Sequence, residues 1–177
     1  TVGSYVNSGV DDYFAGGMDG SEETGFGWDV DISLDGNVVV GTNPYTLSEN
    51  GSARLFTWEN GQWNIPGDPS YITFSRPNAY GGKSVTLSGN STPGSIRFGM
   101  GGPNPNSDNS ETGVHVRTWK WNENWQSNGD DWEPLSPDIP LLTFQGRAGS
   151  EVELDDVGNT MIVSAPWSDA GGTKAGE

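Results

Sequence analysis

The side chains best suited to catalysis are few in this chain and stand far apart. The single histidine, His115, occupies an alternate position of a predicted strand next to Arg117, with no nucleophile and acid beside it. Acidic residues at 22–23 and 130–133 could in principle supply the two carboxylates of a glycoside hydrolase. Carboxylates adjacent in sequence do not, however, have the separation across a sugar that this reaction needs. There is no cysteine, which excludes thiolate chemistry and disulfides. We therefore predict no catalytic residue and no enzyme.

Tryptophan is the other side chain that could bind a ligand, and the chain has eight. Several lie near predicted hairpins, where an aromatic face could stack on a sugar ring. The candidates for carbohydrate stacking are Trp63, Trp121 and Trp125. Their recurrence at matched positions fits packing between repeated sheets equally well, and we favour packing.

Two Asn-x-Ser/Thr sequons begin at Asn50 and Asn90, both in predicted loops or turns. In a secreted eukaryotic protein these asparagines could carry glycans. Together with the repeats described next, the sequons favour an extracellular or cell-surface protein.

These residues belong to a sequence pattern that occurs three times in the chain. Each copy has an alternating apolar strand that starts at a valine, a turn with Gly-Asn, a second apolar strand and a proline. The copies span 30–44, 85–103 and 152–166. The valine and proline are 14 residues apart in the first and third copies and 18 in the second, which therefore carries a four-residue insertion. A period of roughly sixty residues indicates an array of supersecondary units.

The alternation in each first strand predicts which face is buried. Val30 and Ile32 should pack inward with Leu34, as should the equivalent apolar residues of the other copies. Asp31, Thr86 and Glu153 should then face outward. The second strands, at 38–40, 96–98 and 161–163, are more continuously apolar, and we expect them to be buried on both faces.

A third strand and a hairpin follow the first two copies. The segment 53–58 aligns with 114–119 through a shared Thr-Trp, and each is followed by a further tryptophan, Trp63 or Trp125. Asn60-Gly61 suits a tight primed turn, whose two central residues need positive φ. Four strands per repeat are typical of a propeller blade, with a solenoid as the alternative.

The predicted fold is therefore all-β, with about three propeller-type blades of four antiparallel strands. We assign 26–79 to the first repeat, 80–143 to the second and 144–177 to a partial third, while 1–25 supplies a strand and hairpin that complete a blade.

The composition narrows the possible partners. Twenty-four acidic residues against eight basic ones give a formal net charge of −16, which repels nucleic acid and anionic membranes. No apolar run approaches the length of a transmembrane helix, and residues 1–7 lack the pattern of a signal peptide. We predict neither nucleic-acid binding nor membrane insertion.

Together these motifs resemble the FG-GAP repeats of integrin α-chain-type propellers. Phe26-Gly27 corresponds to the Phe-Gly half, with Tyr80-Gly81 and 144–146 in the other copies. The Gly-Ala-Pro half corresponds to Gly-Thr-Asn-Pro at 41–44, Gly-Gly-Pro at 101–103 and Ser-Ala-Pro at 164–166. The resemblance implies a β-propeller that presents loops for adhesion or ligand binding outside the cell.

Many members of that family also carry a calcium loop of the type Asp-x-Asp/Asn-x-Asp-Gly. The corresponding carboxylates here are Asp35, Asp155 and Asp156. These loops offer fewer oxygens than the six to eight that calcium takes. We therefore predict no resident cofactor or metal, with calcium at these aspartates as the alternative.

The third copy stops where the other two begin their third strand, and residues 1–9 have the character of that missing strand. This segment could complete the last blade of its own chain or of a neighbour, or the sequence could be one period of a tandem array. We favour the last two, because a ring of three blades is sterically tight. The predicted function is a non-enzymatic structural or adhesive module that self-associates, as a filament or array, by strand complementation. A carbohydrate-binding propeller, with glycans as partners, is the alternative.

Overall fold

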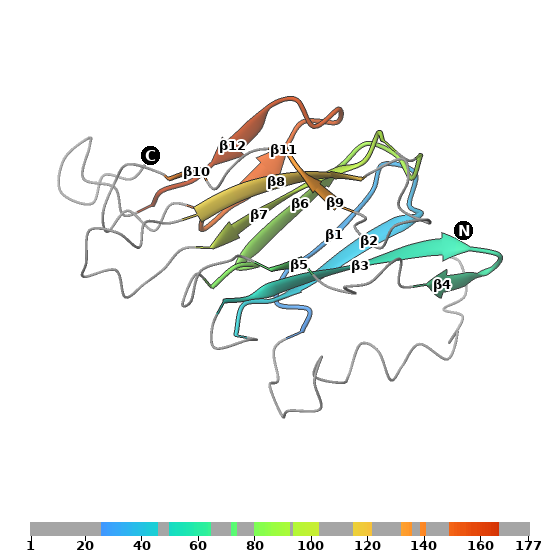
Figure 1. Ribbon diagram of the computed structural model, residues 1–177, viewed down its shortest axis with the longest axis horizontal. Coiled ribbons are helices and arrows are strands. Elements are labelled where there is room, and N and C mark those ends of the chain that lie inside the picture. The colour runs from blue at the N-terminus through green and yellow to red at the C-terminus, as the bar shows by residue number, and fades with distance from the viewer. Residues whose placement is uncertain are drawn as a thin grey trace.

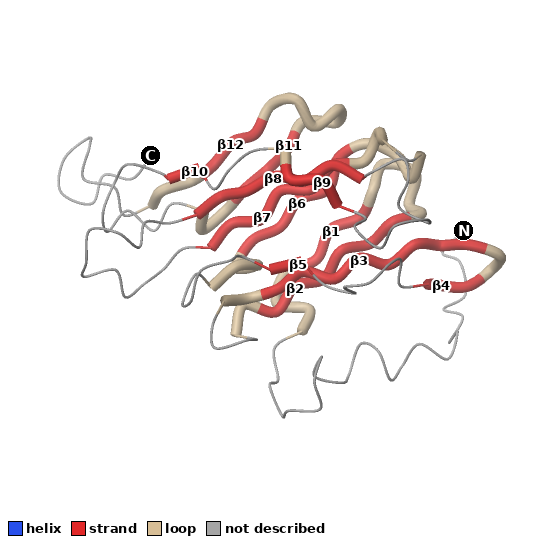
Figure 2. Tube along the Cα trace, in the orientation of Figure 1, coloured by secondary structure: helices blue, strands red, loops and turns tan. Residues whose placement is uncertain are grey.

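The computed structural model describes residues 26–45, 50–64, 72–73, 80–92, 94–102, 115–121, 132–135, 139–140 and 149–166. Within these ranges the regular structure is entirely β-strand, and every named pair of strands is antiparallel (Figures 1 and 2). The predicted all-β class and antiparallel strand pairing are thus confirmed.

The first sheet, called unit 1, contains β1 (Val30–Ile32), β2 (Val38–Asn43), β3 (Ser52–Glu59), β4 (Gln62–Asn64) and β5 (Ile72–Thr73). The strands pair in the order β1-β2-β3, and both β4 and β5 pair with β3. Because β2 occupies one edge of β3, β4 and β5 share the other edge. The sheet therefore has four strand positions, of which the outermost is interrupted.

Unit 2 repeats this plan with β6 (Ser84–Ser88), β7 (Arg97–Gly102), β8 (His115–Trp121), β9 (Trp132–Pro134) and β10 (Ile139–Pro140). Here β9 and β10 share the outer edge of β8. Unit 3 consists, in the described residues, of the hairpin β11 (Val152–Leu154) and β12 (Met161–Val163).

The predicted tight turn between β3 and β4 is confirmed. Asn60 and Gly61 both have positive φ, 54° and 82°, and the flanking residues Glu59 and Gln62 are paired. Two positive φ values in succession define the primed turn that suits the right-handed twist of a hairpin.

Strand register shows which positions of the three units are equivalent. Within the first hairpins Ile32 pairs with Val39, Leu87 with Phe98 and Leu154 with Met161. In addition, one glycine before each hairpin donates its N–H to the residue two before the closing proline. These hydrogen bonds are Gly27 to Thr42 (2.8 Å), Gly82 to Gly101 (3.0 Å) and Gly149 to Ser164 (2.9 Å).

This equivalence revises two details of the sequence alignment. Gly82 and Gly149, rather than Gly81 and Gly146, occupy the position of Gly27, and all three have φ between 78° and 89°. Their distances to the closing prolines, 17, 21 and 17 residues, contain the same four-residue insertion. Gly146 itself lies outside the described residues.

The alignment by Thr-Trp is also out of register, by two residues. Because Val39 faces Phe56 while its equivalent Phe98 faces Trp119, the structural equivalent of Trp58 is Trp121. The cross-strand partners agree, since Trp58 pairs with Trp63 and Trp121 pairs with Trp132. A shift of two keeps each side chain on the same face, so the alternation pattern could not reveal it.

The three units lie side by side, with β6 between β1 and β11 (Figure 1). The core lies mainly between units 1 and 2. Its buried members are Val38, Val40, Ala53, Leu55, Val85, Leu87, Ile96, Phe98, Met100, Trp119 and Trp121.

We call the face that carries Val30, Val85 or Val152 the front of a unit and the opposite face its back. The back of unit 1 packs on the front of unit 2, and the back of unit 2 packs on the front of unit 3.

The predicted burial of the strands is correct in the middle of this stack and wrong at its ends. On the front faces of units 2 and 3 the predicted apolar residues are buried, but Val30, Ile32 and Leu34 of unit 1 are exposed. In the second strands, Val38 and Val40 are fully buried and Val39 is half-buried, whereas Ile162 of β12 is exposed. The end faces differ because no described unit covers them.

Candidate functional site

The interface between units 1 and 2 contains a row of carboxylates that bind backbone N–H groups. Asp29 Oδ2 accepts from the N–H of Val85 (2.8 Å), and Asp31 Oδ2 accepts from that of Leu87 (2.6 Å). Donor and acceptor are 56 residues apart in both bonds. The prediction that Asp31 faces solvent is therefore wrong, because its carboxylate binds the first strand of the next unit.

Asp35 extends this row into the turn after β1. Its Oδ2 accepts from the N–H (2.8 Å) and the hydroxyl (2.6 Å) of Ser91, again 56 residues away. Its Oδ1 accepts from the Ser33 hydroxyl and the Asn37 N–H. Burial alone would raise the pKa of Asp35, but these hydrogen bonds outweigh it and hold the pKa well below its usual range.

The interface between units 2 and 3 uses a hydroxyl at the equivalent position. Thr86 Oγ1 accepts from the Leu154 N–H (3.1 Å), and Thr86 is fully buried, so its predicted outward orientation is also wrong. Glu153, the third member of the set, is exposed as predicted. Burial, with the negative charges of Asp31, Glu151 and Asp29, raises the pKa of Glu153.

One backbone hydrogen bond recurs at both interfaces. Leu34 donates its N–H to Gly89 O (3.0 Å), and Gly89 donates its own N–H to Asp156 O (3.0 Å). Leu34, Gly89 and Asp156 are equivalent positions of the three units. Adjacent units are therefore joined at one shared register.

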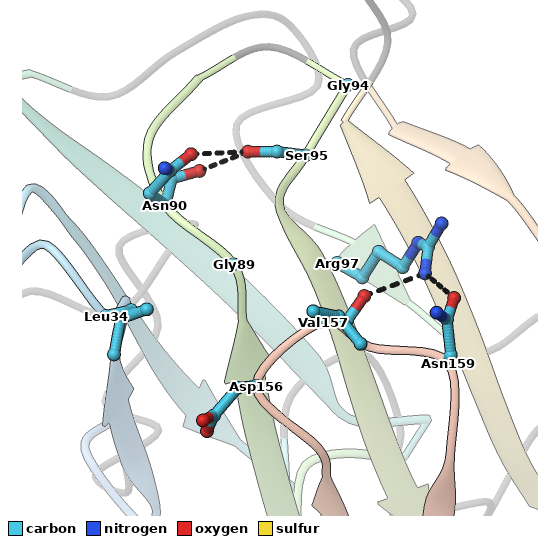
Figure 3. Close-up of a pocket in the computed structure, with 9 residues that line it drawn as sticks. All are labelled: Leu34, Gly89, Asn90, Gly94, Ser95, Arg97, Asp156, Val157 and Asn159. Carbon is cyan, nitrogen blue, oxygen red and sulfur yellow. Dashed lines mark hydrogen bonds between the residues drawn. The ribbon is translucent and has the colours of Figure 1, made fainter.

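The three turns at this end of the molecule surround a hollow of about 430 Å³. Leu34 lies on one side of it and Arg97 with Asn159 on the other (Figure 3). Arg97 Nη1 donates to Asn159 Oδ1 (2.6 Å) and to Val157 O (2.9 Å), which ties unit 2 to the turn of unit 3. The remaining lining residues are Gly89, Asn90, Gly94, Ser95 and Asp156.

The three aspartates considered for calcium do not form one site. Asp35 binds Ser91 as described, and Asp155 Oδ1 accepts from the N–H groups of Asn159 and Thr160 within its own turn. Asp156 lines the hollow. In the described residues no three His, Cys, Asp or Glu side chains are grouped so that they could hold a metal ion.

The predicted tryptophans occupy different environments. Trp63 is half-buried and meets Trp58 edge to face at 5.3 Å, near the tip of the β3–β4 hairpin. Trp121 is only 3% exposed and packs against Trp132 in the core, so its ring offers no open face for a sugar. Trp125 lies outside the described residues.

The two sequons also differ in their surroundings. Asn90 is exposed at the rim of the hollow, where the Ser95 hydroxyl lies 2.7 Å from its Oδ1 (Figure 3). Asn50 is half-buried, and its backbone oxygen accepts from the Gly81 N–H (3.0 Å). Ser52 of the same sequon is fully buried in β3.

Of the residues considered for catalysis, His115 lies on β8 opposite Gly102, and Glu133 is exposed on β9. The acidic residues at 22–23 and 130–131 lie outside the described residues. Asp29 is a structural acceptor that the alternation pattern does not single out, and Asp31 lies at an interface where that pattern predicts an outward-facing residue. The sequence does contain a signal for both aspartates. Each stands directly before an apolar strand residue, Val30 or Ile32, and these two residues recur 55 positions later as Val85 and Leu87.

No protein-family model matches the chain, and no curated protein has a significantly similar sequence. The described residues include no helix that could cross a membrane.

Proposed function

We propose that this chain is a non-enzymatic structural or adhesive module of propeller type, located outside the cell or at its surface. The observation that carries the proposal is the repeated interface, in which Leu34, Gly89 and Asp156 form the same backbone link twice. The carboxylates of Asp29 and Asp31 bind N–H groups of the next unit. Such a chain devotes its polar side chains to joining units, which suits a structural role.

Self-association by strand complementation is part of this proposal. The outer edge of β12 is the position that β3 and β8 occupy in the other units, and no described strand pairs with it. An open edge of this kind favours pairing with an added strand. Residues 1–9, from the same chain or a neighbour, are the proposed donor.

Deletion of residues 1–9 tests strand complementation. We expect the shortened chain to lose stability, and any assembly through this strand, in sedimentation at several concentrations. A synthetic peptide of residues 1–9 should restore both, whereas a scrambled peptide of the same composition should not. Unchanged stability and assembly after the deletion would contradict the donated strand.

Carbohydrate binding is the second candidate, and one observation favours it. Trp58 is 37% exposed and meets Trp63 edge to face, so the pair presents an aromatic surface at a hairpin tip. Binding on a glycan array that is lost on Trp63→Ala but kept on Trp28→Ala, a change at another exposed tryptophan, would support this function. No binding to any glycan by the unaltered chain would reject it.

A further inference from the structure

The two ends of the stack expose apolar side chains whose equivalents are buried inside it. On the front of unit 1, Val30 is 61% and Ile32 is 54% exposed, while the equivalent Val85 and Leu87 are 6% and 8% exposed. Exposed apolar residues that continue an existing packing pattern indicate a contact surface.

The back of unit 3 is open in the same way. Ile162 is 72% exposed, whereas Val40, its equivalent in unit 1, is fully buried against unit 2. The register fixes this equivalence, because Ile162 pairs with Glu153 as Val40 pairs with Asp31.

The back of unit 3 also has the chemistry of the back of unit 1. Both carry one carboxylate on the first strand and one directly before it, one β-branched apolar residue on the second strand and one hydroxyl residue two positions after that apolar residue. The sets are Asp29, Asp31, Val40 and Thr42 in unit 1, and Glu151, Glu153, Ile162 and Ser164 in unit 3. The backbone agrees, since Thr42 donates its N–H to Asp29 O (3.1 Å) and Ser164 donates to Glu151 O (2.9 Å).

The surface that the back of unit 1 binds is known from the structure itself. It is a first strand of the form Val-x-Leu, whose two apolar residues belong to the same buried cluster as Val40 and whose N–H groups donate to the two carboxylates. Unit 1 has such a strand on its own open front, Val30-Asp31-Ile32. There, within the described part of the chain, the N–H groups of Val30 and Ile32 donate to the side chain of the preceding aspartate, at 3.0 Å and 2.7 Å.

We infer that two copies of this chain associate head to tail, with the front of unit 1 of one copy packed on the back of unit 3 of the other. Val30 and Ile32 then cover Ile162, and Glu151 and Glu153 accept the N–H groups of Val30 and Ile32. In this contact the two copies have the same register relative to each other as adjacent units have within one chain. The inference rests on the proposed self-association, but it places the contact on sheet faces and not on the edge of β12.

The contact is heterologous, because the two copies contribute different surfaces. A copy bound at its front still has a free back, so further copies can add. Association then gives an open filament, unless the rotation between copies closes a ring.

Two single variants, each blocking one face, test the inference by sedimentation velocity and light scattering. Ile32→Asp blocks the front and Ile162→Asp blocks the back, and both residues are exposed, so both variants should fold as the unaltered chain does. The unaltered chain should gain mass with concentration. When residues 1–9 pair within their own chain, each variant alone should remain a single chain, because every face-to-face pair needs one intact front and one intact back.

The mixture of the two variants gives the decisive result. Ile32→Asp keeps its back and Ile162→Asp keeps its front, so an equal mixture should form pairs of twice the single-chain mass and grow no further. Leu135→Asp, at an exposed apolar residue after β9, is the matched control and should associate like the unaltered chain.

Three outcomes would overturn the inference. An unaltered chain that stays single at its highest soluble concentration would show that these faces serve another occupant, such as further repeats of a longer chain. Assembly by either variant alone would place the contact elsewhere. If deletion of residues 1–9 abolishes assembly while Ile32→Asp and Ile162→Asp leave it intact, strand complementation stands and face-to-face association fails.

Discussion

The interface between units 1 and 2 and the interface between units 2 and 3 use the same backbone positions but different side chains. At the first, carboxylates of Asp29 and Asp31 accept strand N–H groups, and at the second the Thr86 hydroxyl does so. The neighbouring position on the second strand is Val40 in unit 1 and Gly99 in unit 2. The backbone link is thus the constant part of the repeat, and the side chains vary around it.

The residues that face each other also differ in size between the two interfaces. A Cβ at Gly99 would lie 3.2 Å from Thr86 Cγ2 and 3.4 Å from Met161 Sδ, so the absent side chain leaves room for Met161 of unit 3. Val40 belongs to the same buried cluster as Phe98, the residue of unit 2 that is equivalent to Met161. The buried apolar cluster consists of residues of units 1 and 2, so the larger buried apolar volume lies at the first interface.

The largest expected effect comes from removing that apolar volume. Phe98 is fully buried, stacks on Trp119 at 4.5 Å and meets Trp132 edge to face at 5.1 Å. Phe98→Ala should lower the free energy of unfolding by about 3–5 kcal/mol, measured by urea titration with tryptophan fluorescence. Leu154→Ala, at the interface between units 2 and 3, should cost about 2–3 kcal/mol. A larger loss for Leu154→Ala than for Phe98→Ala would mean that apolar packing stabilises the second interface more than the first.

The next prediction compares the stability that the Asp31 carboxylate contributes with the stability that the Thr86 hydroxyl contributes. Asp31→Ala leaves the Leu87 N–H without its acceptor, and Thr86→Val does the same to the Leu154 N–H at nearly constant volume. We expect a loss of about 1.5–3 kcal/mol for the first, where the acceptor is charged, and about 1–2 kcal/mol for the second. Both are read from urea midpoints at pH 7. Equal losses would mean that the charge of Asp31 contributes nothing to the interface.

The sequence predicted the strands of the described residues and the tight turn at Asn60-Gly61, because alternation and turn residues are local signals. It misplaced the equivalents of Gly27 and Trp58. A Thr-Trp pair or an aromatic-glycine pair can recur near the true position by chance. Register is set instead by hydrogen bonds to a neighbouring strand, which a local match does not contain.

The candidate contact surfaces were harder to predict for a related reason. Val30-x-Ile32 and Val85-x-Leu87 look alike in the sequence, yet the first is exposed and the second is buried. The difference depends only on whether another unit lies in front of the strand. Likewise, the alternation pattern alone gives Asp31 as a solvent-facing residue. The pattern does not show that its carboxylate binds the N–H of Leu87, 56 residues later in the sequence.

A smaller effect, which depends on pH, is expected at Asp35. Hydrogen bonds from Ser91 help to hold the pKa of Asp35 below its unfolded value of about 3.9, so the carboxylate stabilises the fold above that pH. This stabilisation is lost as the pH falls through the unfolded value towards the lower folded pKa. Asp35→Asn should therefore cost about 1 kcal/mol at pH 7 and progressively less below pH 4.

Urea titrations of both chains at several pH values measure this difference. Ser91→Ala serves as the control, because Asp35→Asn should cost less in a chain that already lacks the Ser91 hydroxyl. A cost for Asp35→Asn that is the same at every pH would show that the charge has no part in joining the turns of units 1 and 2.

The smallest effect has the opposite sign and belongs to the open back of unit 3. Burial and the charges of Asp31, Glu151 and Asp29 raise the pKa of Glu153, so its ionised form destabilises the fold above the folded pKa, and acid relieves this. In single chains at low concentration, Glu153→Gln should stabilise by roughly 0.2–0.5 kcal/mol at pH 7, since the group is exposed to solvent. The gain should vanish below the unfolded pKa of glutamate. Thermal melting at pH 7 and pH 3 measures both values, and a destabilised Glu153→Gln chain at pH 7 would mean that Glu153 already has a donor, as Asp31 does.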